Sequence, residues 1–164
     1  MERLRQGISQ VLTVLLVVQG MALVVLISVS VFYRYVLAAA LSWPDEVAGI
    51  VFVWFTLLGV ALLVSENAHI AFEIVESFTP PVVTWLLRLL THAIVILYAA
   101  FMLLYGWQYM QMFPFETSPA AGIDLTWLKS AVPVAGGLIL VFSLMNIVDL
   151  FRVRPWAGER GGRP

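Results

Sequence analysis

The ionisable residues of this chain stand at the ends of long apolar runs. Asp45 and Glu46 precede the apolar run 47–64, and Glu66 and His69 follow it, with no ionisable residue inside the run. Carboxylates and imidazoles could form ion pairs, bind a metal or transfer protons. A charge inside a bilayer is costly and marks a functional site by default, so placement at the two ends favours structural contacts at the rims of a membrane segment.

Three charged residues meet where the first two apolar runs join, namely Arg34, Asp45 and Glu46. Ser42 and Asp45 have the spacing of a capping box, and Pro44 is tolerated in a first helical turn. Carboxylates there also complement the positive end of the helix dipole. This local role accounts for one acid, and we predict that Glu46, the other, pairs with Arg34 across the hairpin.

The remaining ionisable groups near apolar runs also have structural interpretations. Arg88 and His92 share a helix face, where Arg88 can snorkel and His92 is favoured as a helix contact over a proton relay or ligand. Asp149, near Asn146, is expected at a membrane boundary in contact with Arg152. No acid lies in the middle of a run, where self-sufficient transporters place a coupling site, so the chain is not expected to transport alone.

Catalytic apparatus is absent from the sequence. It contains no HExxH, GxSxG or phosphate-binding glycine loop, and no cysteine for a thiolate site or a disulfide. Its nine basic residues are scattered or terminal, which excludes a patch for nucleic acid. We therefore predict that the chain is not an enzyme and holds neither a cofactor nor a metal.

The elements that position these residues are predicted to be membrane helices. Of 164 residues, 62% are hydrophobic and 12% charged, and four runs approach the roughly 20 residues that a span requires. Because the runs do not alternate, a barrel is disfavoured. The fold class is therefore all-α, with one four-helix membrane domain over 1–151, a basic and disordered tail over 152–164, and spans at about 11–33, 47–64, 82–105 and 128–150.

Arginines near both ends predict the orientation. The positive-inside rule places both termini in the cytoplasm, because basic residues flank the first and last spans: Arg3, Arg5, Arg152, Arg154, Arg160 and Arg163. The first run could instead be a signal peptide, but its length favours a retained helix.

The segment 66–78 has the pattern of an amphipathic helix. Glu66, His69, Glu73 and Glu76 fall on one side and apolar residues on the other, before two prolines. We expect it to lie flat at the inner interface. Its acidic face could meet a protein or only solvent.

Two blocks of sequence resemble the DctQ-like small membrane subunit of tripartite ATP-independent periplasmic (TRAP) transporters, over about residues 8–150. The first block runs through Arg34, Tyr35, Trp43, Glu46, Trp54, Gly59, His69 and Glu73. The second, "TSPAAGIDLTWLKSAVP", ends at Pro133, which either starts the last helix or kinks it. Asp124 stands where this family commonly has proline.

The resemblance implies a scaffold subunit in a bacterial inner membrane. In such systems a large permease carries an organic acid inward by sodium symport, a periplasmic binding protein docks transiently, and the small subunit braces the permease among the lipids. Partner-interface or structural residues are then Arg34, Trp43, Glu46, Trp54, Gly59, His69, Glu73 and Pro133. Positions for close helix packing are Gly20, Ala48, Gly49, Gly59, Ala61, Gly136 and Gly137.

Three other functions are alternatives to the scaffold. The chief alternative is a membrane anchor that holds haem b between His69 and His92. A small drug exporter would need a carboxylate in its first span, which has none. An assembly factor without a transport role is the third possibility.

Overall fold

Four long helices make up the part of the protein that the structure describes. The computed structural model describes residues 2–66 and 80–152, and there the chain is all-α apart from an isolated antiparallel bridge between Thr117 and Asp124. All four helices are long and apolar enough to cross a membrane, as predicted. They are α1 (Glu2–Tyr35), α2 (Trp43–Ser65), α4 (Pro81–Met112) and α5 (Thr126–Arg152).

Each helix contains its predicted span and extends beyond it. The largest extension is in α1, whose 34 residues correspond to about 51 Å of helix. Polar residues at its start continue the helix, since hydrophobicity marks only the part that crosses hydrocarbon. The predicted interfacial helix at 66–78 lies outside the described residues, except for Glu66 at the end of α2.

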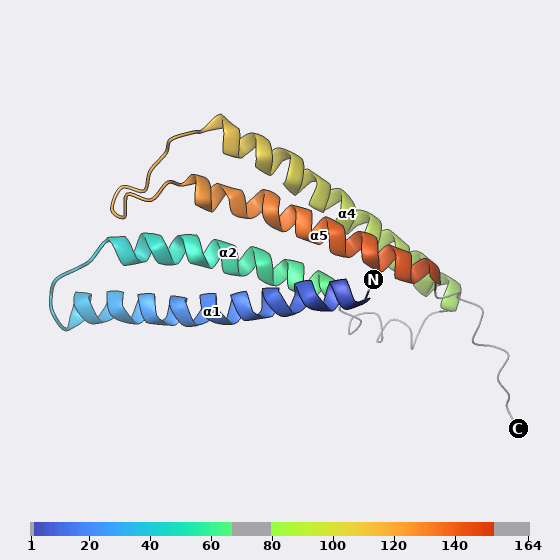
Figure 1. Ribbon diagram of the computed structural model, residues 1–164, viewed down its shortest axis with the longest axis horizontal. Coiled ribbons are helices and arrows are strands. Elements are labelled where there is room, and N and C mark those ends of the chain that lie inside the picture. Colours follow the sequence, from blue (N-terminus) through green and yellow to red (C-terminus); the bar gives the residue numbers. More distant parts are fainter. Residues whose placement is uncertain (1, 67–79, 153–164) are drawn as a thin grey trace, which may run out of the picture.

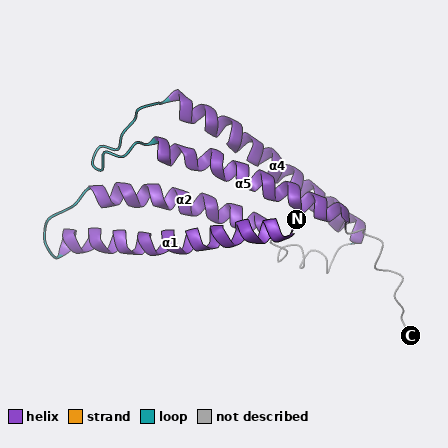
Figure 2. Cartoon of the chain, viewed as in Figure 1, coloured by secondary structure: helices purple, strands orange, loops and turns teal. Residues whose placement is uncertain are grey.

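The helices are arranged in the order α1, α2, α5, α4. Neighbours pack along this series, so that α2 and α5 are central and α1 and α4 form the two edges (Figures 1 and 2). The two fully described connecting loops, 36–42 and 113–125, lie at one end of the molecule, which we call the loop end (Figure 1). The start of α1 and the end of α5 lie at the opposite, terminal end (Figure 1).

Small residues allow α4 and α5 to approach closely. A Cβ at Gly136 would lie 2.9 Å from the Leu103 amide nitrogen, and one at Gly106 would lie 3.0 Å from Pro133 Cδ. Ala61 and Ala99 are fully buried in a cluster with Ile139. Lipid provides no hydrophobic force between helices, so their association in a membrane depends on close packing. Small residues permit such packing because they let the backbones approach.

The close-packing predictions are confirmed for Gly136 and Ala61 but not for Gly49, where an added Cβ would meet nothing within 4 Å. Gly106 was missed. Pro133 does not start the last helix, because α5 begins at Thr126 and contains the proline. Since proline has no N–H, the helix loses one backbone hydrogen bond there.

Candidate functional site

The polar contacts of the loop end begin with Arg34 at the end of α1. Its Nη2 lies 2.5 Å from Asp45 Oδ2, and Ser30 Oγ donates to Asp45 Oδ1 at 2.7 Å. The prediction that Glu46 pairs with Arg34 is therefore wrong, because Asp45 occupies that role. Ser42 makes no side-chain capping bond, so the capping box does not form either. Asp45 lies on the side of α2 that faces α1. Because successive residues point about 100° apart on a helix, the adjacent Glu46 points in a different direction.

Glu46 instead holds the second loop. Its carboxylate accepts a hydrogen bond from the Ser118 hydroxyl and from the backbone N–H groups of Ala120 and Ala121, at 3.0 and 2.8 Å to Oε2. Gly122, with φ of +64°, permits the turn that aims these amides at one point. This contact joins α2 to the loop between α4 and α5, and sequence reasoning missed it.

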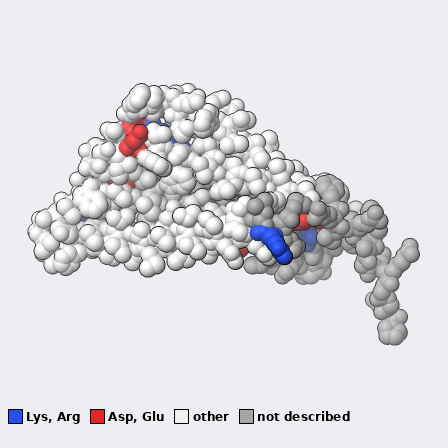
Figure 3. All heavy atoms as spheres, in the orientation of Figure 1, with Lys and Arg blue, Asp and Glu red and all other residues white. Residues whose placement is uncertain are grey.

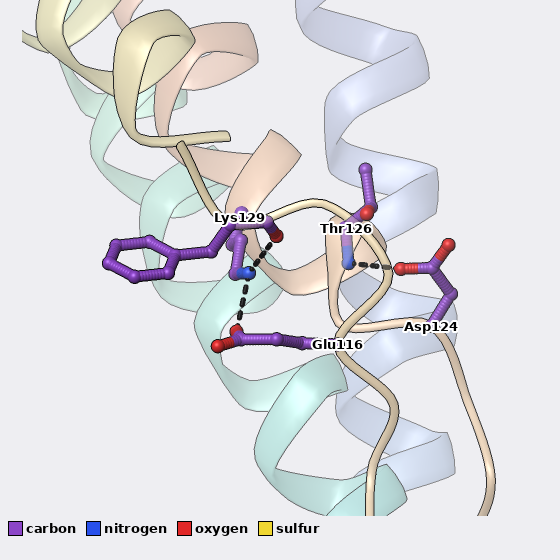
Figure 4. Close-up of polar contacts among 5 residues, drawn as sticks. Glu116, Asp124, Thr126 and Lys129 are labelled. Carbon is purple, nitrogen blue, oxygen red and sulfur yellow. Dashed lines mark hydrogen bonds and ion pairs between the residues drawn. The ribbon is translucent and has the colours of Figure 1, made fainter. Parts of the chain in front are cut away.

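Lys129 holds the same loop from α5 (Figure 4). The side chain is buried, and Nζ donates to the Phe113 carbonyl oxygen at 2.8 Å and to Glu116 Oε2 at 2.6 Å. Lys129 was not singled out in the sequence. The possible signal was a lone lysine in the first two turns of an apolar helix, where a charge needs a partner.

Asp124 caps the start of α5. Its Oδ1 accepts the Thr126 N–H at 2.8 Å (Figure 4). Hydrogen bonds from the side chain and backbone of Thr126 hold the pKa of Asp124 below its ordinary value of 3.8. An aspartate is well suited to this position, because its carboxylate satisfies an otherwise unpaired helix donor.

Other predicted site residues have simpler surroundings. The Trp54 indole N–H donates to the Trp127 carbonyl oxygen at 2.9 Å, which ties α2 to the first turn of α5. Trp43 is exposed at the start of α2, and Gly59 makes an ordinary contact with Leu16 of α1. His69 and Glu73 lie outside the described residues.

At the terminal end, Arg5 joins three helices. Its guanidinium donates to the Ser65 carbonyl oxygen at the end of α2 and lies 3.8 Å from Asp149 Oδ2 on α5. Asn146 Nδ2 donates to the Val64 carbonyl oxygen at 2.8 Å. The Asp149–Arg5 pair was not predicted, and the side chain of the predicted partner, Arg152, is outside the described part.

Charges on the face drawn in Figure 3 gather towards the two ends, with an uncharged surface between them. Within 2–66 and 80–152, no three histidine or acidic side chains are grouped as a metal site would require. The polar residues instead bind one another and fasten loops to helices. These features define a multi-pass helical membrane protein whose polar groups serve its architecture.

The comparisons with known proteins identify the group within that class. A family model described as "Tripartite ATP-independent periplasmic transporters, DctQ component" matches residues 21–153, and the chain belongs to this family. It is also similar to the sialic acid TRAP transporter small permease protein SiaQ of Vibrio cholerae. The two are 23% identical over 154 residues, which cover 93% of this chain and 88% of the relative.

Family membership confirms several predictions. The chain is a small TRAP permease subunit, a multi-pass protein of the inner membrane and not an enzyme. The family implies association with a large permease subunit and a substrate-binding protein. Neither comparison supports the haem-binding alternative.

Proposed function

We propose that this subunit braces the large permease of a sodium-coupled TRAP transporter for organic acids. One observation carries the proposal: polar groups at both ends are paired within the chain, whereas the outer helices α1 and α4 expose apolar side chains along their length. Among the described residues no acid lies in the middle of a span, so this row of helices is suited to pack sideways against a larger protein.

The helix order supports a bracing role. Four helices in series present a broad surface. The contacts of Glu46 tie the two hairpins together at the loop end, and Lys129 fixes the second loop to α5. A permease that moves substrate by sliding one domain past another needs a stationary frame that resists tilting. In this proposal sodium and the organic acid bind to the large subunit, while the binding protein docks transiently.

The orientation belongs to the same proposal. Basic residues near the two termini favour a cytoplasmic terminal end, which places the loop end in the periplasm. The interface or structural roles of the predicted residues are also proposals, and they concern Arg34, Trp43, Glu46, Trp54, Gly59, His69, Glu73 and Pro133.

An apolar groove between α1 and α2 is the candidate contact with the permease. Its volume is about 610 Å³, and its lining includes Leu16, Gly20, Met21, Val24 and Phe55. Side chains of a neighbouring helix can insert into such a groove, as ridges pack into grooves between helices.

Co-purification tests this proposal. The complex should be recovered from membranes through a tag on this subunit, and Gly20→Trp should reduce recovery of the large permease by filling the groove. Leu97→Trp, on the exposed face of α4, is the matched control and should leave recovery unchanged. Normal recovery with Gly20→Trp would exclude the groove as the contact.

Transport assays test whether the large permease, and not this subunit alone, carries the substrate. Vesicles containing both membrane subunits, supplied with the binding protein, should take up an organic acid along a sodium gradient, and vesicles with this chain alone should not. Solute accumulation by this chain alone would contradict the scaffold role.

A further inference from the structure

Phe115 combines two unusual properties in the loop between α4 and α5. Its φ is +68°, in the left-handed region that residues other than glycine rarely adopt, and its side chain is 92% exposed. A bulky residue persists in this conformation only where surrounding contacts over-determine it. An aromatic ring that is exposed to this extent therefore requires an explanation outside the chain.

The surrounding contacts come from Lys129. Its Nζ binds the Phe113 carbonyl on one side of Phe115 and the Glu116 carboxylate on the other. Nζ also lies 5.6 Å from the centre of the Phe113 ring and 5.8 Å from that of Tyr109. The buried ammonium thus fixes the turn on both sides and leaves the Phe115 ring projecting from it.

The loop presents no unpaired charge beside this ring. Glu116 and Asp124 are the two charged residues of 113–125, and they bind Lys129 and the Thr126 N–H respectively. Large apolar or aromatic residues are exposed around the loop and the adjoining helix ends, namely Tyr109, Met112, Phe113 and Trp127, together with the uncharged polar residues Gln108 and Gln111. Tyrosine and tryptophan favour the headgroup level of a bilayer, so this composition matches the boundary between headgroups and acyl chains.

We propose that Phe115 is a membrane anchor that inserts its ring among the phospholipids at the loop end. The span within α4 has 31 residues, or about 46 Å of helix, against a hydrocarbon thickness of about 30 Å. A span longer than the bilayer is accommodated by tilting, by kinking or by local thickening of the bilayer, and interfacial anchors help to set the depth and tilt of a helix. In Figure 1, α4 is inclined relative to α1. Lys129 is the positioning residue, and the anchor requires only that the chain spans a bilayer.

A nitroxide at position 115 tests the depth of this residue. The natural chain has no cysteine, so Phe115→Cys supplies a single labelling site in this subunit, and the unsubstituted complex supplies the labelling blank. The complex with the large permease is placed in discs of phosphatidylethanolamine and phosphatidylglycerol. Collision of the label with oxygen, which partitions into lipid, is compared with collision with a water-soluble nickel chelate. Leu97→Cys, exposed near the middle of α4, provides the reference within the bilayer.

The anchor predicts that the label at 115 collides with oxygen several-fold more than with the chelate, at a shallower depth than the Leu97 label. Equal access to both reagents would place residue 115 in water. Protection from both would place it under a protein partner. Either of these results overturns the proposal.

A second measurement leaves residue 115 unlabelled. A nitroxide at Met112→Cys, the last residue of α4, is compared with and without Phe115→Asn, since asparagine tolerates positive φ and lacks the ring. Loss of the anchor should raise access of the chelate to the Met112 label several-fold. Unchanged access would contradict the anchoring role even if the position-115 label perturbs the turn.

Discussion

Glu46 and Ser118, which are 72 residues apart in the sequence, form a direct side-chain hydrogen bond at the loop end. Together with the Ala120 and Ala121 amides, this bond attaches the second loop to the start of α2. The first hairpin is closed separately, by Arg34 and Asp45. Two adjacent acids on one helix therefore serve two different loops.

A double-mutant cycle should separate the two acids. Glu46→Ala and Ser118→Ala should be coupled, so that the double variant loses less stability than the sum of the two single variants, because each removes the same contact. Glu46→Ala and Arg34→Ala should be nearly additive, because Arg34 pairs with Asp45. Unfolding of the purified protein in mild detergent measures both cycles. Strong coupling of Glu46 to Arg34 would refute the pairing described here.

Replacing Lys129 by methionine should destabilise the loop end. The Phe113 carbonyl and the Glu116 carboxylate lose their shared donor, at an expected cost of about 1–3 kcal/mol. Ser130→Ala is the control, since this hydroxyl only bonds a carbonyl of its own helix and its loss should be nearly neutral. The melting temperature in detergent provides the comparison. Equal values for both variants would argue against a stabilising role for the buried Lys129 contacts.

Enlarging Gly136 should disturb the contact between α4 and α5. A Cβ there meets the Leu103 amide nitrogen and Met102 Cβ at 2.9 Å, so Gly136→Val should destabilise by about 1–3 kcal/mol or more. Gly137→Val is the matched control, because its Cβ would lie 3.9 Å from Leu103 Cδ1, an ordinary van der Waals contact. Thermal unfolding measures both, and a milder effect at Gly136 than at Gly137 would contradict the packing.

The Asp124 cap should make stability depend on pH under acidic conditions. Because folding lowers its pKa below 3.8, the cap contributes fully above the unfolded value and is lost as pH falls through the lower folded value. Asp124→Asn keeps a capping side chain but cannot titrate. The difference in melting temperature between wild type and this variant should therefore change only below about pH 4. A difference that changes between pH 5 and 7 would indicate another titrating group.

The apolar runs by themselves determined the helical class and the number of spans. In hydrocarbon each backbone N–H and carbonyl must be satisfied within the segment, so a run of this length has essentially one solution. Motif order, through residues such as Arg34, Trp43 and Pro133, was sufficient to indicate the family that the comparison then confirmed.

Only the tertiary structure decided which polar groups meet. Asp45 and Glu46 are adjacent acids, and their partners depend on how α2 is rotated against α1 and where the second loop folds back. The same holds for Lys129, whose partners come from the preceding loop, and for Gly106, whose role depends on the approach of Pro133. Apolar length is a local property that adds along the chain, whereas helix rotation is set by many weak packing contacts between segments distant in sequence.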